Sequence, residues 1–267
     1  MKIKIGSLLI ILFLFSCSNK PKHPQADLAS RYSDVPENER SILLYADSID
    51  IESKNMNKHS SLVYQMDGKS LYAEKYSWQG VATLYIEQTT SEGLSEKTSR
   101  LYLKNDTLLL IKELMKRTQG QDTVFEEKRT FLRSNIPFKQ EHKTAISSSA
   151  LNTRSFQDLK IASTIENYTD QINTLNAALS GTDKFELIFD QFISSSEGQY
   201  ILLKSSLPGG YHSSITVNEN DAFTDSLLLY PQAFKDARLP IKWEVQNKEA
   251  FYVPVAASVT SAKGLKR

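Results

Sequence analysis

The sequence contains a single cysteine, no excess of charge of either sign, and only a short apolar run at its N-terminus. One cysteine among 267 residues excludes an internal disulfide framework and a cysteine-rich zinc site. Because 32 Lys and Arg residues balance 31 Asp and Glu residues, no basic surplus indicates nucleic acid as a partner. With 40% hydrophobic residues the chain is too apolar for a wholly disordered protein, and it is long enough to bury a substantial core.

Motifs of catalysis and metal binding are also missing from the sequence. There is no HExxH, GxSxG, P-loop or glycine-rich dinucleotide pattern. The histidines are scattered, and no two of them lie three or four residues apart: His23, His59, His142 and His212. His212 precedes two serines, but neighbours on a strand point to opposite faces and make a poor nucleophile–base pair. We therefore expect no enzyme, no cofactor and no metal site.

The first sixteen residues have the form of a secretory signal. Lys2 and Lys4 precede an apolar stretch at residues 5–15. As a helix this stretch extends roughly 16 Å, too short for a hydrocarbon core of about 30 Å. The pattern therefore favours a signal peptide over a transmembrane helix.

The only cysteine follows this stretch directly, in the string Leu14-Phe15-Ser16-Cys17. The string resembles the lipobox of bacterial lipoproteins, although Phe15 is bulkier than the usual residue at its position. The resemblance implies cleavage before Cys17, acylation of Cys17 (palmitate among the expected chains) and stable attachment to a membrane. Because Ser18 and Asn19 follow instead of aspartate, it implies the outer membrane, on its periplasmic face or at the cell surface.

The rest of the chain predicts an α+β, β-rich fold in four parts. Residues 17–40, rich in Pro, Ser and charge, predict a lipidated tether. Residues 41–145 predict an antiparallel β-meander, with Asp67-Gly68 as a strong hairpin signal. Residues 146–182 predict a linker and a long amphipathic helix that begins near Ser155 and stops at Gly181. Residues 183–260 predict a small α+β domain whose element order matches an oligonucleotide/oligosaccharide-binding (OB) barrel.

Aromatic residues gather in the first and the last predicted hairpins. The first group, Tyr72, Tyr76, Trp78 and Tyr85, is a candidate stacking surface for a glycan or for side chains of a partner. The second group is Trp243, Phe251 and Tyr252. Ordinary cross-strand packing is the more common role of such residues and remains the alternative.

Four short triplets combine Asp, a hydroxyl residue and an aliphatic residue, where the composition predicts roughly one by chance. The triplets resemble the O-glycosylation acceptor of Bacteroidota envelope proteins, which implies modification of Ser48, Thr107, Thr123 and Ser226. Asp-Ser/Thr turn chemistry explains the same pattern equally well.

With the lipobox and the triplets, the chain resembles Bacteroidota envelope lipoproteins as a group, which implies no particular activity. We expect a non-enzymatic binding or structural role, with an envelope protein or a glycan as partner and the membrane bound through the lipid. The alternative is a carrier of a lipid or another apolar ligand in a half-barrel, which needs a deep apolar pocket between the sheet and the 155–180 helix. An enzyme ranks third and needs His59, His142 or His212 to meet carboxylates in a cleft.

Overall fold

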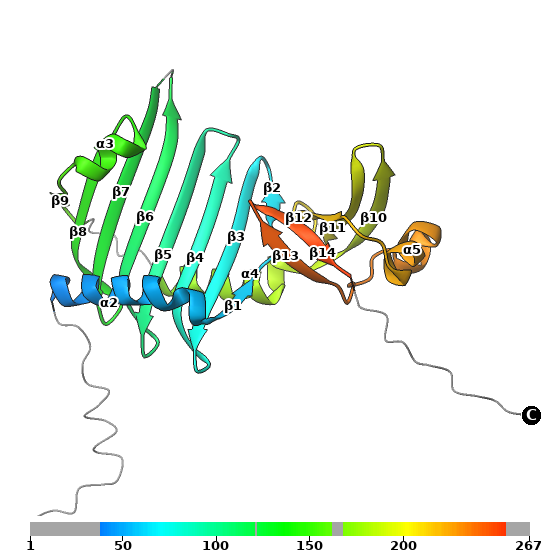
Figure 1. Ribbon diagram of the computed structural model, residues 1–267, viewed down its shortest axis with the longest axis horizontal. Helices are drawn as coiled ribbons and strands as arrows, with labels where there is room; N and C mark the ends of the chain where they lie inside the picture. Colours follow the sequence, from blue (N-terminus) through cyan, green and yellow to red (C-terminus); the bar gives the residue numbers. More distant parts are fainter. Residues whose placement is uncertain (1–37, 121, 162–167, 255–267) are drawn as a thin grey trace, which may run out of the picture. The chain divides into compact units, whose positions relative to one another are not determined.

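The computed structural model describes residues 38–120, 122–161 and 168–254, all within one compact unit (Figure 1). Strands dominate this unit and a few helices accompany them, which confirms the predicted α+β, β-rich class. The 14-stranded sheet has the order β10-β11-β12-β2-β3-β4-β5-β6-β7-β8-β9, and β1, β13 and β14 pair beside this path. No helix in the described ranges is long and apolar enough to span a membrane.

The larger part of the sheet is an antiparallel meander. Its strands are β1 (Asn57–Ser60), β2 (Tyr64–Met66), β3 (Lys69–Trp78), β4 (Val81–Ser91), β5 (Ser95–Lys104), β6 (Thr107–Gln119), β7 (Asp122–Arg133), β8 (Ile136–Ala145) and β9 (Gln157–Leu159). Turn residues set its hairpins: Asp67 and Gly68 have φ of 49° and 70°, and Asn105 and Asp106 have φ of 52° and 59°. Two-residue hairpin loops of type I′ need positive φ at both positions, which Asn, Asp and Gly tolerate.

A helix lies where the sequence predicts the end of the tether and the start of the meander. Helix α2 (Glu39–Glu52) begins at the N-cap Asn38, whose side chain accepts a hydrogen bond from the Ser41 N–H. It buries Ile42, Ala46 and Ile49, and Figure 1 shows it running across the strands of the meander. A short 3₁₀ turn, η1 (Ser53–Asn55), joins it to β1. The range predicted as meander, 41–145, therefore opens with a helix, because three apolar residues at helical spacing suffice once a sheet face covers them.

The predicted long helix is shorter than its pattern indicates. Within the 155–180 range the chain first forms β9, which pairs with the free edge of β8, and helix α4 spans Tyr168–Ser180. Before β9, the short helix α3 (Ser148–Thr153) occupies the expected linker. Gly181, with φ of 59°, follows the last residue of α4 as predicted. Periodic apolar residues predicted helix from Ser155, but the exposed backbone of β8 offers residues 157–159 hydrogen bonds that a local pattern cannot reveal.

The C-terminal part continues the same sheet. A 3₁₀ turn, η2 (Asp183–Phe185), leads into its strands and helices: β10 (Leu187–Ser195), β11 (Gly198–Ser205), β12 (His212–Val217), α5 (Ala222–Leu229), α6 (Pro231–Phe234), β13 (Lys242–Gln246) and β14 (Glu249–Val253). Three antiparallel strands, a helical segment and a hairpin whose β14 runs parallel to β12 retain the OB-like element order. Among the strands described, none closes β13 on β10.

One hydrophobic core runs through both predicted folded domains, 41–145 and 183–260. Strand β12 pairs with β2 at His212 and Gln65, so the two sets of strands share a sheet. Helix α4 contributes Leu175, Ala178 and Leu179 to a buried cluster that contains side chains from both parts. The domain boundary predicted at residues 146–182 therefore falls within one compact unit.

Candidate functional site

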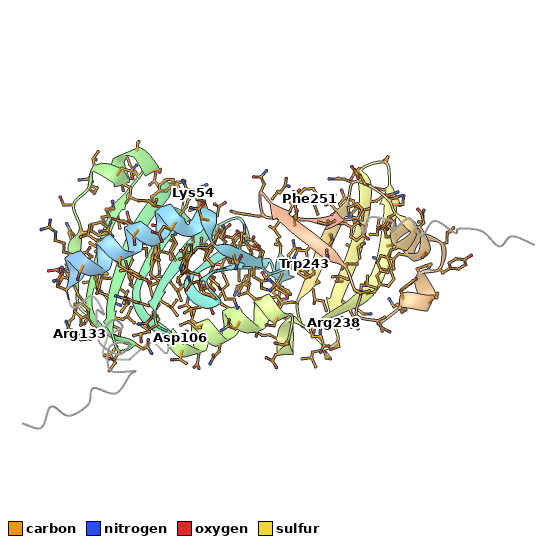
Figure 2. The ribbon with its side chains drawn as sticks, turned by 60° about the horizontal axis from the view of Figure 1, so that its bottom comes forward. Lys54, Asp106, Arg133, Arg238, Trp243 and Phe251 are labelled. Atoms are coloured by element: carbon orange, nitrogen blue, oxygen red, sulfur yellow. The ribbon has the colours of Figure 1, made fainter. Side chains whose placement is uncertain are left out.

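An open cleft of about 640 Å³ lies between the short strand β1 and the hairpin strand β13. Its walls come from segments about 180 residues apart in the sequence: Lys58, His59 and Ser60 on one side, and Ile241, Lys242, Trp243, Glu244 and Val245 on the other. Figure 2 shows Trp243 between the meander and the C-terminal strands. The cleft thus forms where the two parts of the sheet meet.

Trp243 is held in place by the backbone next to β1. Its indole N–H donates a hydrogen bond of 3.2 Å to the carbonyl oxygen of Ser61. That carbonyl is not needed in the β1–β3 ladder, because the Ser61 Oγ accepts the Ala73 N–H in its place at 2.9 Å. The half-buried indole therefore forms a fixed apolar surface at the cleft, with its one polar group already satisfied.

Charged side chains stand at the rim of the cleft. Lys58 Nζ lies 2.6 Å from a carboxylate oxygen of Glu74. Lys242 and Glu244 are exposed on β13, and neither has an ion pair with another residue in the described part of the chain. The rim therefore presents two charges of opposite sign that are available to a partner.

A buried carboxylate holds Lys58 in position. Glu74 is 8% exposed and accepts hydrogen bonds from the hydroxyls of Tyr72 (2.7 Å) and Tyr76 (2.8 Å). Burial alone would raise the pKa of Glu74, but the bonds from Lys58, Tyr72 and Tyr76 outweigh burial and lower it. Burial also raises the pKa of both tyrosine hydroxyls, which keeps them protonated as donors.

A second cavity of about 270 Å³ shares Ile241 and Trp243 with the cleft. Its other walls are mostly apolar: Leu62, Tyr64, Leu179, Phe185, Leu187, Leu203 and Leu239. Arg238 also lines it and is loosely held, with its guanidinium 3.4 Å from the Ser180 carbonyl oxygen and 4.0 Å from Glu186. This cavity can hold a small apolar group beside a cation.

The carrier hypothesis predicts a deep apolar pocket between the sheet and the long helix. In the described residues this interface is filled, because Leu175 and Leu179 of α4 pack with Leu71, Tyr85 and Leu101 of the sheet. Hydrogen bonds from Tyr85 to Asn176 and from Tyr64 to the Ala178 carbonyl close it further. The small cavity at Arg238 therefore lies at the end of α4 and not beneath it.

The predicted aromatic surface does not form. Tyr72 and Tyr76 lie on one face of β3 and donate to Glu74, whereas Tyr85 lies on the opposite face of β4 and donates to Asn176 on α4. Tyr72 and Tyr85 are buried, Tyr76 is half-buried, and Trp78 is 48% exposed. Strand alternation and the register of β3 with β4 separate these rings, so cross-strand and helix packing is their role.

The histidines lie in separate places. His59 lines the cleft and its Nε2 lies 3.0 Å from the Leu179 carbonyl oxygen, whereas His212 is exposed at the start of β12. His142 does meet a carboxylate, Glu126, at 3.2 Å on the neighbouring strand. In the described residues, no three His, Cys, Asp or Glu side chains gather as a metal site would require. His23 lies outside the described residues.

The four triplets occupy two kinds of position. Thr107 and Thr123 stand near the starts of β6 and β7, directly after hairpin turns. Ser48 and Ser226 lie on α2 and α5, and their hydroxyls donate to the carbonyl oxygens of Tyr45 and Ala222. All four are at least partly exposed. Residues 1–37, with the signal, Cys17 and most of the tether, lie outside the described residues.

Sequence reasoning noted Trp243 as an aromatic of the last hairpin but missed the cleft and the role of Glu74. Nothing local in the sequence signals that β1 and β13 face each other. Comparison of the chain with protein-family models, with curated proteins and with solved structures gives no match.

Proposed function

We propose that this protein is a lipid-anchored envelope lipoprotein with a non-enzymatic binding role, and that the cleft at Trp243 is its binding site. The observation that carries the proposal is a fixed, half-buried tryptophan at an open cleft whose rim bears the available charges of Lys242 and Glu244. An apolar aromatic centre with a charged rim is typical of protein-binding surfaces. The lipobox at Cys17 supports the membrane anchor.

A protein partner is favoured over a glycan. Glycan binding would use exposed aromatic faces and free polar groups, but Tyr72 and Tyr85 are buried and the Trp243 N–H is already bonded to Ser61. Beside Trp243 the cleft offers the apolar side chains of Ile241 and Val245. These features suit apolar side chains of a protein better than sugar hydroxyls.

Replacement of Trp243 by alanine is expected to lower affinity for the envelope partner about 30-fold or more, since buried tryptophans dominate binding energies. Full-length protein is cross-linked in envelopes, the partner is identified by mass spectrometry, and the dissociation constant is measured with both purified proteins. Trp78→Ala is the matched control, because Trp78 is the other tryptophan, is 48% exposed and does not line the cleft. Lys242→Glu reverses an exposed rim charge without touching the core, and should also weaken binding.

Equal loss of affinity in the Trp78→Ala and Trp243→Ala proteins would contradict the assignment of the site. Failure of the wild-type protein to capture any partner, together with hydrolytic activity on a substrate panel, would contradict the binding role itself.

The lipid anchor and the triplets are tested by mass. We expect Cys17→Ser to move the protein from the membrane fraction to the soluble fraction, because acyl chains supply the attachment at about 0.8 kcal/mol per buried methylene. Intact mass of the native protein should correspond to residues 17–267 plus lipid.

The triplets are tested on peptides of the native protein. Peptides that carry Ser48, Thr107, Thr123 and Ser226 without added mass would exclude glycosylation. The hydrogen bonds of turns and helices would then explain why the triplets recur.

A carrier of an apolar ligand is the second candidate, and the cavity beside Arg238 is the observation that favours it. Its apolar walls with one loosely held cation suit a small apolar ligand that carries an anionic group. Lipid in place of protein in the wild-type capture would favour this candidate over the first.

A further inference from the structure

Both strands that border the cleft have an edge without a strand partner in the described part of the chain. Strand β1 pairs only with β3, and β13 pairs only with β14. No other backbone bond is formed there by residues 57–60 or 242–246. An unpaired strand edge is a template for another strand.

The hairpin turn shows which groups of β13 point into the cleft. Asn247 and Lys248 have φ of 50° and 67°, as in a two-residue hairpin loop. In such a hairpin the residues on either side of the loop, here Gln246 and Glu249, form a hydrogen-bonded pair. Bonded and non-bonded pairs alternate in an antiparallel ladder, so Glu244 also bonds to β14. The N–H and C=O groups of Trp243 and Val245 therefore face away from β14.

The same reasoning applies to β1. The Ser61 N–H donates to the Ala73 carbonyl oxygen, which fixes the bonded pairs of the β1–β3 ladder. His59 lies two residues before Ser61, so its backbone groups also bond to β3. The backbone groups of Lys58 and Ser60 therefore face away from β3. Because Lys58, Ser60, Trp243 and Val245 all line the cleft, both open edges border one space.

We propose that the cleft binds an extended peptide segment of a partner protein, which adds as a strand to the outward backbone groups of Trp243 and Val245. The inference rests on the function proposed above and names the form of its partner. Main-chain hydrogen bonds to an exposed edge supply affinity, and pockets for alternate side chains supply specificity. Trp243 and Val245 lie half-buried on one face of β13, the half-buried Ile241 directly precedes the strand, and the charged Lys242 and Glu244 lie on the other face. The segment therefore has apolar residues at alternate positions and an acidic residue opposite Lys242.

Edge protection is the competing explanation. Short edge strands that carry lysine resist unwanted pairing, and Lys58 and Lys242 fit that role. Protection, however, does not require an apolar cavity beside the edge, whereas the edge of β13 adjoins both the cleft and the cavity behind Trp243. The two explanations differ in whether backbone groups of a peptide contribute to binding.

The test uses full-length protein and a phage library of random heptapeptides as the probe. Enriched peptides are synthesised with unmodified amides and with N-methyl groups on either alternate set of amides. We expect at least one methylated set to lower affinity about tenfold or more, since N-methylation removes the donors and keeps the side chains. Val245→Pro, which removes an outward N–H from an edge position where proline is tolerated, should have a similar effect. Val245→Ala, the matched control, keeps the N–H.

No enriched peptide, or equal affinity of all methylated and unmodified peptides, would overturn strand addition. If in that case the envelope partner is still captured through Trp243, the proposed function stands and only its peptide form fails. Two other results would contradict an external partner, because each would identify a different occupant of the cleft. One is a dimer of the protein that dissociates on Val245→Pro substitution. The other is a photo-cross-link from position 242 to residues 255–267 of the same chain. The methylated peptides act on unaltered protein, so the test does not depend on the folding of a variant.

Discussion

Replacement of Glu74 by leucine is expected to lower the free energy of unfolding by about 1–3 kcal/mol at pH 7, because it leaves the hydroxyls around a buried carboxylate without that acceptor. The hydroxyls of Tyr72 and Tyr76 and the Lys58 ammonium all donate to Glu74. The buried Tyr72 hydroxyl accounts for most of the effect, since Lys58 is partly exposed and finds water. Urea unfolding of both proteins measures the difference.

The control is another glutamate of the same sheet. Glu96 lies 3.5 Å from Lys248 in an exposed ion pair, so Glu96→Leu should cost less than about 1 kcal/mol. A similar loss in the two variants would show that the Glu74 network contributes no more than a surface charge. The Glu74→Leu protein should also bind the partner more weakly, because Lys58 at the cleft loses its fixed position.

The stability gap between wild-type and Glu74→Leu protein should narrow in acid. The pKa of Glu74 is lowered in the folded protein, so the ionised carboxylate stabilises the fold fully above the unfolded pKa of about 4.3. This contribution is lost as the pH falls through the lower, folded pKa. Urea unfolding at pH 7, 5, 4 and 3 tests the sign. A gap that does not change with pH would mean that the charge of Glu74 does not stabilise the fold.

The meander was predictable from sequence because its signals are local. Asp67-Gly68 specifies a hairpin without reference to distant residues, and Gly181 ends a helix through its own φ. Alternation of apolar and polar residues then fixes which face of each strand is buried. The fold class follows from these elements alone.

Elements that depend on distant partners were not predictable. Residues 157–159 carry a helical pattern, yet they pair with β8 because that edge is open. Helix α2 buries only Ile42, Ala46 and Ile49, whereas its other large apolar residues stay at least partly exposed: Leu43, Leu44, Tyr45 and Ile51. Both errors come from the same cause, since tertiary contacts override weak local preference.

The candidate site was harder to predict than the fold. The four aromatics were grouped by their closeness in sequence, but the register of β3 with β4 places Tyr85 opposite the face of Tyr72. The cleft needs β1 and β13 to meet, and no sequence pattern of either strand specifies the other. Trp243 was recognised as an aromatic of a hairpin, whereas its function depends on the Ser61 carbonyl.

Replacement of Phe185 by alanine is expected to lower the free energy of unfolding by about 3–5 kcal/mol, because it removes a fully buried ring from the centre of the core. Phe185 is 1% exposed, and its ring centroid lies 4.8 Å from those of both Tyr64 and Tyr211. Tyr64 in turn donates to the Ala178 carbonyl of α4. Phe185 thus joins β2, the end of α4 and the segment before β12. Leu229→Ala, at a site 68% exposed, is the control and should change stability by less than about 0.5 kcal/mol.

The shape of the Phe185→Ala transition tests whether the core is single. Because β2 and β12 pair and α4 packs against both parts of the sheet, we expect one cooperative transition at a lower denaturant concentration, with unchanged slope. Two transitions, with the C-terminal strands lost first, would show that the meander and the 183–260 segment are separate cooperative units. In that case the cleft would lie at a junction that opens independently, and partner affinity would fall with Phe185→Ala even though Phe185 does not line the cleft.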